Sequence, residues 1–223
     1  MLYAIMTAAW LDKTFYGFDE GILRFYHNLG ELTDYHINGF FKFISALAEY
    51  GLGMIILAAL MAFVPLIPKL YLKNPERAKK ICICGLSAGL AMAFGLLFTN
   101  MCIKNAVARI RPYEAYDTFR QWWSLAGGYP DAEFSFPSGH TTCTMAIMTS
   151  IFIYGRKKYS WTAFFMVILM GMSRNYLMMH YPTDIMGGMV VGGVAAILAS
   201  LVWKFLSPGF FALYERLYKK KDA

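Results

Sequence analysis

Five long apolar segments constrain this chain more than any other feature of its sequence. They cover about residues 51–70, 81–103, 138–154, 161–179 and 185–206. A helix of about 17–25 apolar residues crosses the roughly 30 Å hydrocarbon core of a bilayer. Hydrophobic residues make up 58% of the chain and charged residues 16%, against about 45–50% and 25% in soluble domains. The sequence therefore predicts an all-α, polytopic integral membrane helical bundle with about five spanning helices.

The formal charge of +7 reports on topology and not on a nucleic-acid partner, because the cations gather between and after the apolar segments. Cytoplasmic loops of membrane proteins carry such an excess of lysine and arginine. We therefore expect the C-terminus to be cytoplasmic, and five crossings then place the N-terminus outside. The clustered cations are Lys69, Lys73, Arg77, Lys79 and Lys80, then Arg156, Lys157 and Lys158, and finally Arg216, Lys219, Lys220 and Lys221.

We predict one membrane domain over residues 1–223, because neither a repeat nor a low-complexity linker divides it. Residues 1–50 mix aromatic and charged residues and predict an interfacial segment of one or two amphipathic helices, with a shortened first membrane helix as the alternative. The transmembrane bundle covers 51–206, and 207–223 form a basic cytoplasmic tail. Small residues spaced by four, Gly85 to Gly89 and Gly188 to Gly192, predict close packing between helices of the bundle.

The first polar motif is Lys104-x6-Arg111-Pro112, after the second apolar segment. A spacing of seven is about two helical turns, so both cations share one face if that helix continues. Arginine offers a planar fork and lysine a point charge to phosphate oxygens. Snorkelling of the two cations to lipid headgroups is the alternative interpretation.

The second motif, Pro137-Ser138-Gly139-His140, opens the third apolar segment. Ser138 suits a helix N-cap, and Gly139 allows close approach of the backbone to a ligand. A helix N-terminus binds anions through its free N–H groups and dipole. His140 would face such an anion, although a plain serine cap with an interfacial histidine is the alternative.

The third motif runs from Ser173-Arg174 through His180 to Asp184, from the end of the fourth segment to the start of the fifth. Four residues separate the imidazole from the carboxylate across a turn containing Pro182. A hydrogen bond between them would fix the histidine tautomer and leave the other ring nitrogen free to attack. A purely structural His–Asp pair is the alternative.

The predicted topology brings all three motifs to the same, extracytoplasmic membrane face. Phosphoryl transfer needs a nucleophile, cations around the equatorial oxygens and an acid for the leaving group. His180 would be the nucleophile and His140 the acid, with Lys104, Arg111 and Arg174 around the phosphate. We find no carboxylate cluster for Mg²⁺, and Cys82-x-Cys84 has no second pair to complete a metal site, so we expect no metal and no cofactor.

These stretches resemble the signature motifs of the type-2 phosphatidic acid phosphatase superfamily, which also contains vanadium haloperoxidases and nonspecific acid phosphatases. The resemblance covers about residues 100–188. It implies that His180 forms a phosphohistidine that water hydrolyses, that Asp184 orients His180, and that His140 protonates the leaving oxygen. It also implies metal independence, inhibition by vanadate and, for the membrane branch, lipid phosphate substrates. The matching positions are Lys104, Arg111, Pro112, Pro137, Ser138, Gly139, His140, Ser173, Arg174, His180 and Asp184.

The sequence thus predicts a metal-independent lipid phosphatase whose partners are a lipid phosphate and membrane lipids, with neither nucleic acid nor an obligatory protein partner. Undecaprenyl diphosphate, phosphatidate and phosphatidylglycerol phosphate are the candidate substrates, and the resemblance to undecaprenyl diphosphate phosphatases favours the first. A lipid-linked phosphotransferase with the same intermediate is one alternative. A non-catalytic lipid binder or flippase is another, although anion binding alone does not require His140 and His180. A haloperoxidase is disfavoured by the lipid-facing segments.

Overall fold

The computed structural model describes residues 2–48 and 51–219, and within this part the chain is helical with no β-strand. The all-α prediction is therefore confirmed. The helices are α1 (Leu2–Leu32), α2 (Asn38–Ala46), α3 (Leu52–Phe63), η2 (Val64–Leu66), α4 (Pro68–Lys73), α5 (Pro75–Leu96), η3 (Leu97–Ile103), α6 (Lys104–Val107), α7 (Pro112–Ala115), α8 (Asp117–Ala126), α9 (Gly139–Tyr154), α10 (Lys157–Ser160), η4 (Trp161–Ala163), α11 (Phe164–Tyr176) and α12 (Pro182–Lys219).

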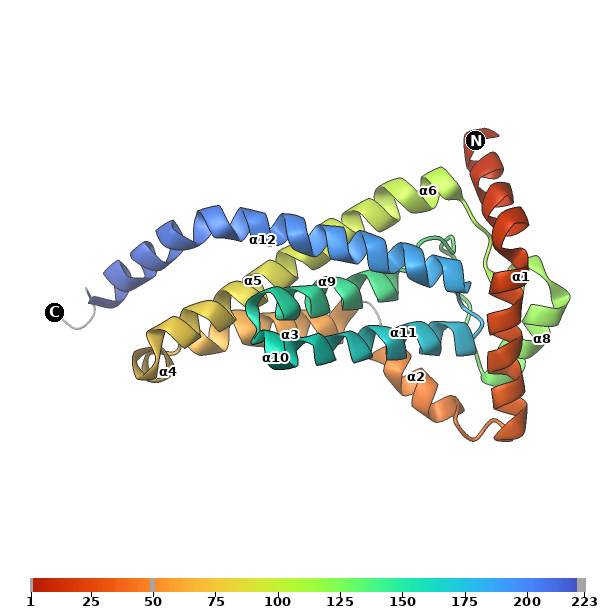
Figure 1. Ribbon diagram of the computed structural model, residues 1–223, viewed down its shortest axis with the longest axis horizontal. Coiled ribbons are helices and arrows are strands. Elements are labelled where there is room, and N and C mark those ends of the chain that lie inside the picture. The colour runs from red at the N-terminus through yellow and green to blue at the C-terminus, as the bar shows by residue number, and fades with distance from the viewer. Residues whose placement is uncertain (1, 49–50, 220–223) are drawn as a thin grey trace.

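Three long helices, α5, α9 and α12, pack against one another along the length of the molecule (Figure 1). Helix α3 packs on α5, and α11 packs on α9. Helix α1 crosses one end of this bundle and contacts α6, α11 and α12, while α4, α10 and the C-terminal part of α12 lie at the other end (Figure 1). The polar motifs therefore lie near α1, at the end opposite to the C-terminus.

Glycine allows two of these helix pairs to touch backbone to backbone. A Cβ at Gly192 of α12 would lie 2.4 Å from the carbonyl oxygen of Thr142 in α9, and one at Gly85 of α5 would lie 2.6 Å from the carbonyl oxygen of Ala58 in α3. The predicted close packing at these two glycines is thus confirmed. Gly89 has open space beside it, so the small residue there is not required for contact.

Local sequence signals explain where the central helices begin. Asn74 accepts a hydrogen bond from the backbone N–H of Arg77, and Pro75 follows in the first turn of α5. Ser138 caps α9 in the same way, through the backbone N–H of Thr141. A side-chain oxygen at the N-cap satisfies a backbone donor that the helix itself leaves unpaired. The starts of α5 and α9 are therefore determined by polar N-cap residues.

Two of the five predicted spans are long and apolar enough to cross a membrane by themselves. They lie in the stretches Pro75–Ala115, which is helical as far as Val107 and again from Pro112, and Pro182–Leu217, whereas Leu52–Leu66 is a shorter apolar helix. Helices α9 and α11 have 16 and 13 residues, which corresponds to about 24 and 20 Å at about 1.5 Å per residue. Helix α12 also continues past residue 206, where the fifth span was expected to end, and residues 220–223 of the predicted tail lie outside the described part. The number of spans stays a prediction.

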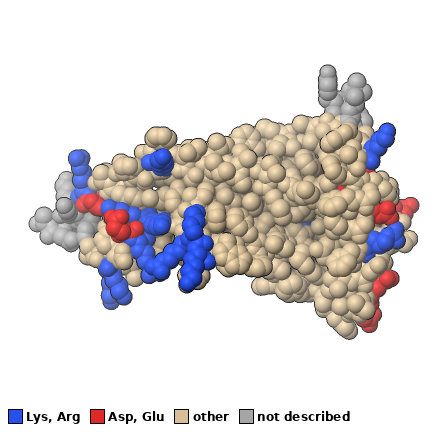
Figure 2. Space-filling model, in the orientation of Figure 1, with Lys and Arg blue, Asp and Glu red and all other residues tan. Residues whose placement is uncertain are grey.

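Charged side chains are concentrated at the two ends of the molecule, and the surface between them is almost free of charge in the face that Figure 2 shows. Many large apolar side chains of the helices are exposed, among them Leu60, Phe98, Val190, Ile197, Leu201 and Phe205. A charge-poor band together with exposed apolar side chains is unusual for a water-exposed surface.

Candidate active site

A cavity of about 490 Å³ opens among the three motifs. Five of the eight residues that the sequence predicts for the site line it: Lys104, Arg111, Gly139, His140 and His180. The other three, Ser138, Arg174 and Asp184, are fully buried and reach the cavity through the residues that line it. Its remaining wall is formed partly by Ala48, Gly51, Leu96 and Cys143, which are apolar or small. The cavity thus joins a charged region to an apolar one.

His180 lies in the turn between α11 and α12, and its ring is held from both sides. On one side, Nε2 lies 3.3 Å from Nη1 of Arg111. On the other, Nδ1 lies 3.4 Å from the Ser135 hydroxyl and 3.6 Å from Oδ2 of Asp184. A guanidinium only donates, so Nε2 carries the lone pair and Nδ1 the proton. The nitrogen with the free lone pair is therefore the one beside the Arg111 guanidinium.

Ser135 connects His180 to Asp184. Its hydroxyl donates to Oδ2 of Asp184 at 2.5 Å and faces Nδ1 of His180, and the same carboxylate oxygen also accepts the backbone N–H of Tyr181 at 2.8 Å. The expected direct hydrogen bond between His180 and Asp184 is not made, because their 3.6 Å separation is too long for one. Ser135, two residues before the second motif, was not foreseen from the sequence.

The surroundings of His180 favour its neutral form. Burial lowers the pKa of this imidazole well below its ordinary value of 6.5, and the nearby cations Arg111, Arg174 and Lys104 lower it further. Charging the ring would cost both its lost hydration and repulsion from these cations. His180 is therefore unprotonated at neutral pH.

The first motif reaches the cavity by a different route from the expected one. Helix α6 ends at Val107, and Ala108 adopts a left-handed conformation with φ of 52°. Arg111 is extended, with φ of −70° and ψ of 153°. The expectation that Lys104 and Arg111 share one face of a continuous helix is therefore wrong: the tertiary structure breaks the helix between them, and the loop brings Arg111 beside His180.

The two cations of the first motif form ion pairs with two carboxylates. Arg111 donates to Asp131 at 2.6 Å, and Lys104 pairs with Glu133. Arg111 also donates to the backbone carbonyls of Glu133 and Met179, at 2.8 and 3.0 Å. Because the side chain of Glu133 is 55% exposed, its link to Lys104 is open to exchange with another anion. The segment 131–133 thus supplies anions at the position where a phosphate would bind.

The residues of the second motif have different positions: one caps helix α9 and two line the cavity. The side chain of Ser138 accepts from Thr141, and its backbone N–H donates to the carbonyl oxygen of Asp184 at 3.1 Å. Gly139 is the first helical residue of α9 and lines the cavity. Nε2 of His140 is buried without a hydrogen-bond partner. Ser138 therefore builds the helix start, while Gly139 and His140 face the cavity.

Arg174 is buried completely beside this cavity. Its Nη1 donates to Ser45 at 2.6 Å and to Tyr129 at 2.7 Å, and Tyr129 lines the cavity. Nε and Nη2 of the same guanidinium have no hydrogen-bond partner. Unpaired buried donors on a cation are costly, and an anion in the cavity is a natural acceptor for them.

Arg109, which falls inside the first motif, links Asp184 to the N-terminal helix. Its Nη1 donates to Asp184 at 2.7 Å, and its other nitrogens donate to Asp12 and Asp19 of α1, both at 2.8 Å. Asp19 also accepts the backbone N–H and the hydroxyl of Thr183, at 3.0 and 2.7 Å. Sequence reasoning missed this network. The available signal was a pair of aspartates two helical turns apart in an otherwise aromatic segment.

Among the described residues, no three His, Cys, Asp or Glu side chains are grouped so that they could hold a metal ion.

Comparison with known proteins identifies related sequences. The model of the PAP2 superfamily matches residues 84–207. A lipid A 1-phosphatase of Rhizobium etli is 29% identical over 134 residues, which is 57% of this chain and 56% of that protein. A lipid A 4'-phosphatase of Porphyromonas gingivalis is 38% identical over 40% of this chain and 38% of its own length. The undecaprenyl-diphosphatase BcrC of Bacillus subtilis is 36% identical over 40% of this chain and 45% of its own.

The chain thus spans about half the length, or less, of these curated relatives. Among solved structures, the crystal structure of Aquifex aeolicus LpxE aligns with 72% of this chain and 92% of its own, with a TM-score of 0.37 and 21% identity.

Proposed function

Because the chain belongs to the PAP2 superfamily, we propose that it is an integral-membrane phosphatase of lipid phosphates or diphosphates that works through a phosphohistidine. The observation that carries the proposal is the position of His180. It lines a cavity of about 490 Å³ with its basic nitrogen beside Arg111, while Ser135 and Asp184 hold its other nitrogen. A purely structural histidine needs neither the cavity nor the cations around it.

In the proposed reaction, the substrate phosphate displaces Asp131 and Glu133 and binds Arg111 and Lys104. The unpaired N–H groups of Arg174 and the free N–H groups at the start of α9 add further donors. Cations and oriented N–H groups stabilise the charge on the equatorial oxygens in the transition state. The phosphorus is then held in front of Nε2 of His180.

The lone pair of His180 Nε2 forms the N–P bond while the bond from phosphorus to the leaving oxygen breaks. His140, which takes up a proton when the anionic phosphate occupies the cavity, donates this proton to that oxygen, and the lipid alcohol or lipid monophosphate leaves. The proton on Nδ1 of His180 remains there, directed at Ser135 and Asp184, which stabilises the positive charge that the ring gains. Water then attacks the phosphorus and forms a P–O bond while the N–P bond breaks and its electron pair returns to Nε2 of His180. Neutral His140 accepts a proton of this water, so that free phosphate and neutral His180 are released.

The apolar band between the charged ends supports the membrane location, and the apolar wall of the cavity suits a lipid tail. The relatives named above act on lipid A or on undecaprenyl diphosphate according to their names. We therefore propose a lipid A phosphate or undecaprenyl diphosphate as substrate, ahead of phosphatidate and phosphatidylglycerol phosphate.

The test is phosphate release by purified protein in detergent with EDTA present, from each of these four lipids. We expect release from at least one substrate, formation of an acid-labile phosphoprotein during turnover, and loss of both in His180→Ala. Phosphate transfer to a second lipid without free phosphate would indicate a phosphotransferase. A folded protein that binds the lipids but releases phosphate from none of them would indicate a binder or flippase, and His180→Ala would then leave lipid transport intact.

A further inference from the structure

A second cavity lies at the end of the molecule opposite to the candidate active site. It has a volume of about 1180 Å³ and lies between α5, the turn that joins α9 to α10, and the C-terminal part of α12. Helix α12 contains Pro208, and Figure 1 shows that it bends toward its C-terminal end. A proline inside a helix produces such a bend, and Pro208 itself lines the cavity.

The cavity has an excess of positive charge. Four cations and two carboxylates line it, so its net formal charge is +2. Lys79 is paired with both carboxylates, at 3.9 Å from Glu76 and 3.0 Å from Glu215. The other three cations, Arg77, Lys80 and Arg156, are exposed, and among the described residues none has a carboxylate partner.

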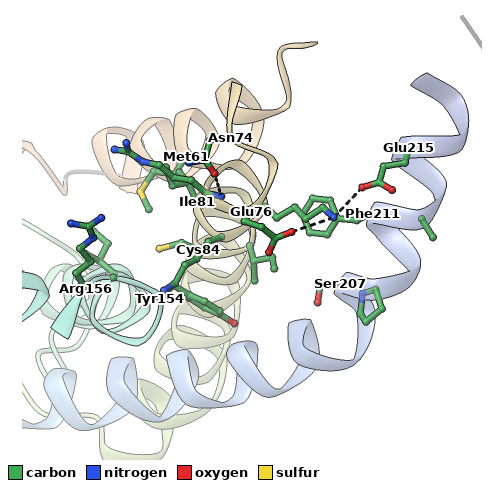
Figure 3. A pocket seen from close by; sticks show the side chains of 18 residues that line it. Met61, Asn74, Glu76, Ile81, Cys84, Tyr154, Arg156, Ser207, Phe211 and Glu215 are labelled. Carbon is green, nitrogen blue, oxygen red and sulfur yellow. Dashed lines mark hydrogen bonds and ion pairs between the residues drawn. The ribbon is translucent and has the colours of Figure 1, made fainter. Parts of the chain in front are cut away.

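Hydrogen bonds and an ion pair join the helices that form the walls of this cavity. Most of the wall residues are apolar. Glu215 of α12 accepts a hydrogen bond from Tyr71 of α4 at 2.8 Å, and it binds Lys79 of α5 as well. Tyr214 donates to the backbone carbonyl of Leu66. Figure 3 shows Glu215 and Arg156 on opposite sides of the space, with Met61, Ile81 and Phe211 between them. The bent part of α12 is therefore held in place against α4 and α5.

We propose that this cavity binds an anionic membrane phospholipid. The headgroup phosphate lies among Arg77, Lys80 and Arg156, and an acyl chain lies against the apolar wall. The unpaired cations complement a phosphate, the apolar wall complements a lipid chain, and basic pockets between membrane helices bind anionic headgroups in this way. The site does not depend on the proposed phosphatase activity, because none of its lining residues belongs to the candidate active site.

The test is native mass spectrometry of the full chain in detergent, with phosphatidylglycerol and phosphatidylcholine of the same acyl chains as probes. We expect one phosphatidylglycerol to be retained more tightly than phosphatidylcholine. At about 1 kcal/mol per basic residue, the triple variant Arg77→Gln, Lys80→Gln and Arg156→Gln should bind phosphatidylglycerol about hundredfold more weakly. Arg156→Gln alone should bind it several-fold more weakly, which keeps the test valid if the triple variant does not fold.

The matched control is the triple variant Lys69→Gln, Lys158→Gln and Arg216→Gln. It removes the same number of charges from the same end, and none of these residues lines the cavity. We expect it to bind phosphatidylglycerol like the wild type. If phosphatidylglycerol binding is weakened equally in both triple variants, the proposed site is overturned, and the lipid is attracted by basic residues in general. Equal retention of both lipids, or displacement of the lipid by millimolar inorganic phosphate, would overturn it as well.

Discussion

The two histidines of the candidate site differ in what surrounds them. His180 has partners on both ring nitrogens, Arg111 on one side and Ser135 on the other, so its orientation is restrained. His140 has a buried Nε2 without a partner and also lines the cavity. A nucleophile needs a restrained lone pair, whereas a proton donor needs access to the leaving oxygen. The surroundings therefore suit His180 to attack and His140 to proton transfer.

This division predicts how His140→Ala depends on the leaving group. General acid catalysis contributes about 10²–10⁴-fold, so we expect a loss in that range with an alkyl phosphate. The loss should be several-fold at most with a 4-nitrophenyl phosphate, whose leaving oxygen needs no proton. Initial rates with both substrates provide the measurement, and His180→Ala, which should lose both activities, is the control. Equal losses on the two substrates would contradict the assignment of His140 as the acid.

A second prediction concerns the pH dependence. The pKa of His180 is lowered below 6.5 by burial and by the cations Arg111, Arg174 and Lys104. The neutral ring is the reactive form, so activity is present above this lowered pKa and is lost as the pH falls through it. We expect the acid limb of kcat/KM, which reports the free enzyme, to lie below pH 6.5. Measuring the pH profile with two substrates whose phosphate groups have different pKa values distinguishes titration of the enzyme from titration of the substrate. An acid limb that lies above pH 6.5 with both substrates would contradict the prediction.

Arg174 supplies a third prediction. Arg174→Ala should lower kcat/KM by about hundredfold or more, because it removes a cation with two unpaired nitrogens beside the phosphate position. The protein should stay folded, because the buried guanidinium has no carboxylate partner among the described residues. Activity and a melting curve measure the two effects. Ser45→Ala, which removes one partner of Arg174 and keeps the charge, is the milder control. Normal turnover in Arg174→Ala would remove this residue from the site.

At the scale of elements, α1 is part of the site and not only a cover over it. Its Asp12 and Asp19 both bind Arg109, which binds Asp184, and Asp19 also holds Thr183 at the start of α12. The helix thus adds two carboxylates that Arg109 links to Asp184. These hydrogen bonds join α1 to the candidate site, a contact that the sequence alone did not predict.

We therefore expect Asp19→Asn to lower kcat by about tenfold to hundredfold with a smaller change in KM, because a small displacement of Asp184 and His180 has effects of that size. Asp12→Asn is the matched control: Asp12 binds the same arginine, but its side chain is 41% exposed, and its loss should matter less. Steady-state kinetics on both variants decides the matter. Wild-type kcat in Asp19→Asn would mean that α1 only packs against the bundle.

At the scale of the whole molecule, the elements that line the two cavities lie at opposite ends (Figure 1). On the face that Figure 2 shows, a charge-poor surface separates these ends. The end with the polar motifs includes α1 and α8, whereas the other end includes α4, α10 and the end of α12. The basic clusters of the sequence, as far as residue 219, belong to this second end. From the positive-inside rule we propose that the second end is cytoplasmic and that the candidate active site faces the extracytoplasmic side.

Cysteine labelling tests this orientation. In a Cys102→Ser background, which removes the exposed cysteine, we expect a membrane-impermeant maleimide to label Asp117→Cys in intact cells and not Lys158→Cys. Asp117 begins α8 and its side chain is 93% exposed, while Lys158 lies in α10. Both positions should react after permeabilisation, which is the control. Labelling of position 158 alone in intact cells would reverse the proposed topology.

The helical class, the start of α9 and the gathering of the motifs follow from the sequence because each depends on local information. Apolar length predicts a helix of the bundle, Ser138 caps α9 by a contact within one turn, and alternating crossings bring chain segments to one end. The start of α5 at Pro75 is six residues earlier than the apolar segment that begins at about residue 81. The residue types at these ends, two imidazoles with cations and a carboxylate, limit the chemistry to handling of an anion.

The tertiary structure alone decided which of these groups are partners. Asp19 and Thr183 are 164 positions apart, and Ser135 and Asp184 are 49 apart, yet each pair is joined by a hydrogen bond whose existence depends on a few tenths of an ångström. The break at Ala108, which turns Arg111 toward His180, follows from the packing of the surrounding loop and not from propensity, since alanine favours helix. Sequence spacing predicts a shared end of the bundle, but a hydrogen bond is short and directional, so only the packed structure selects it.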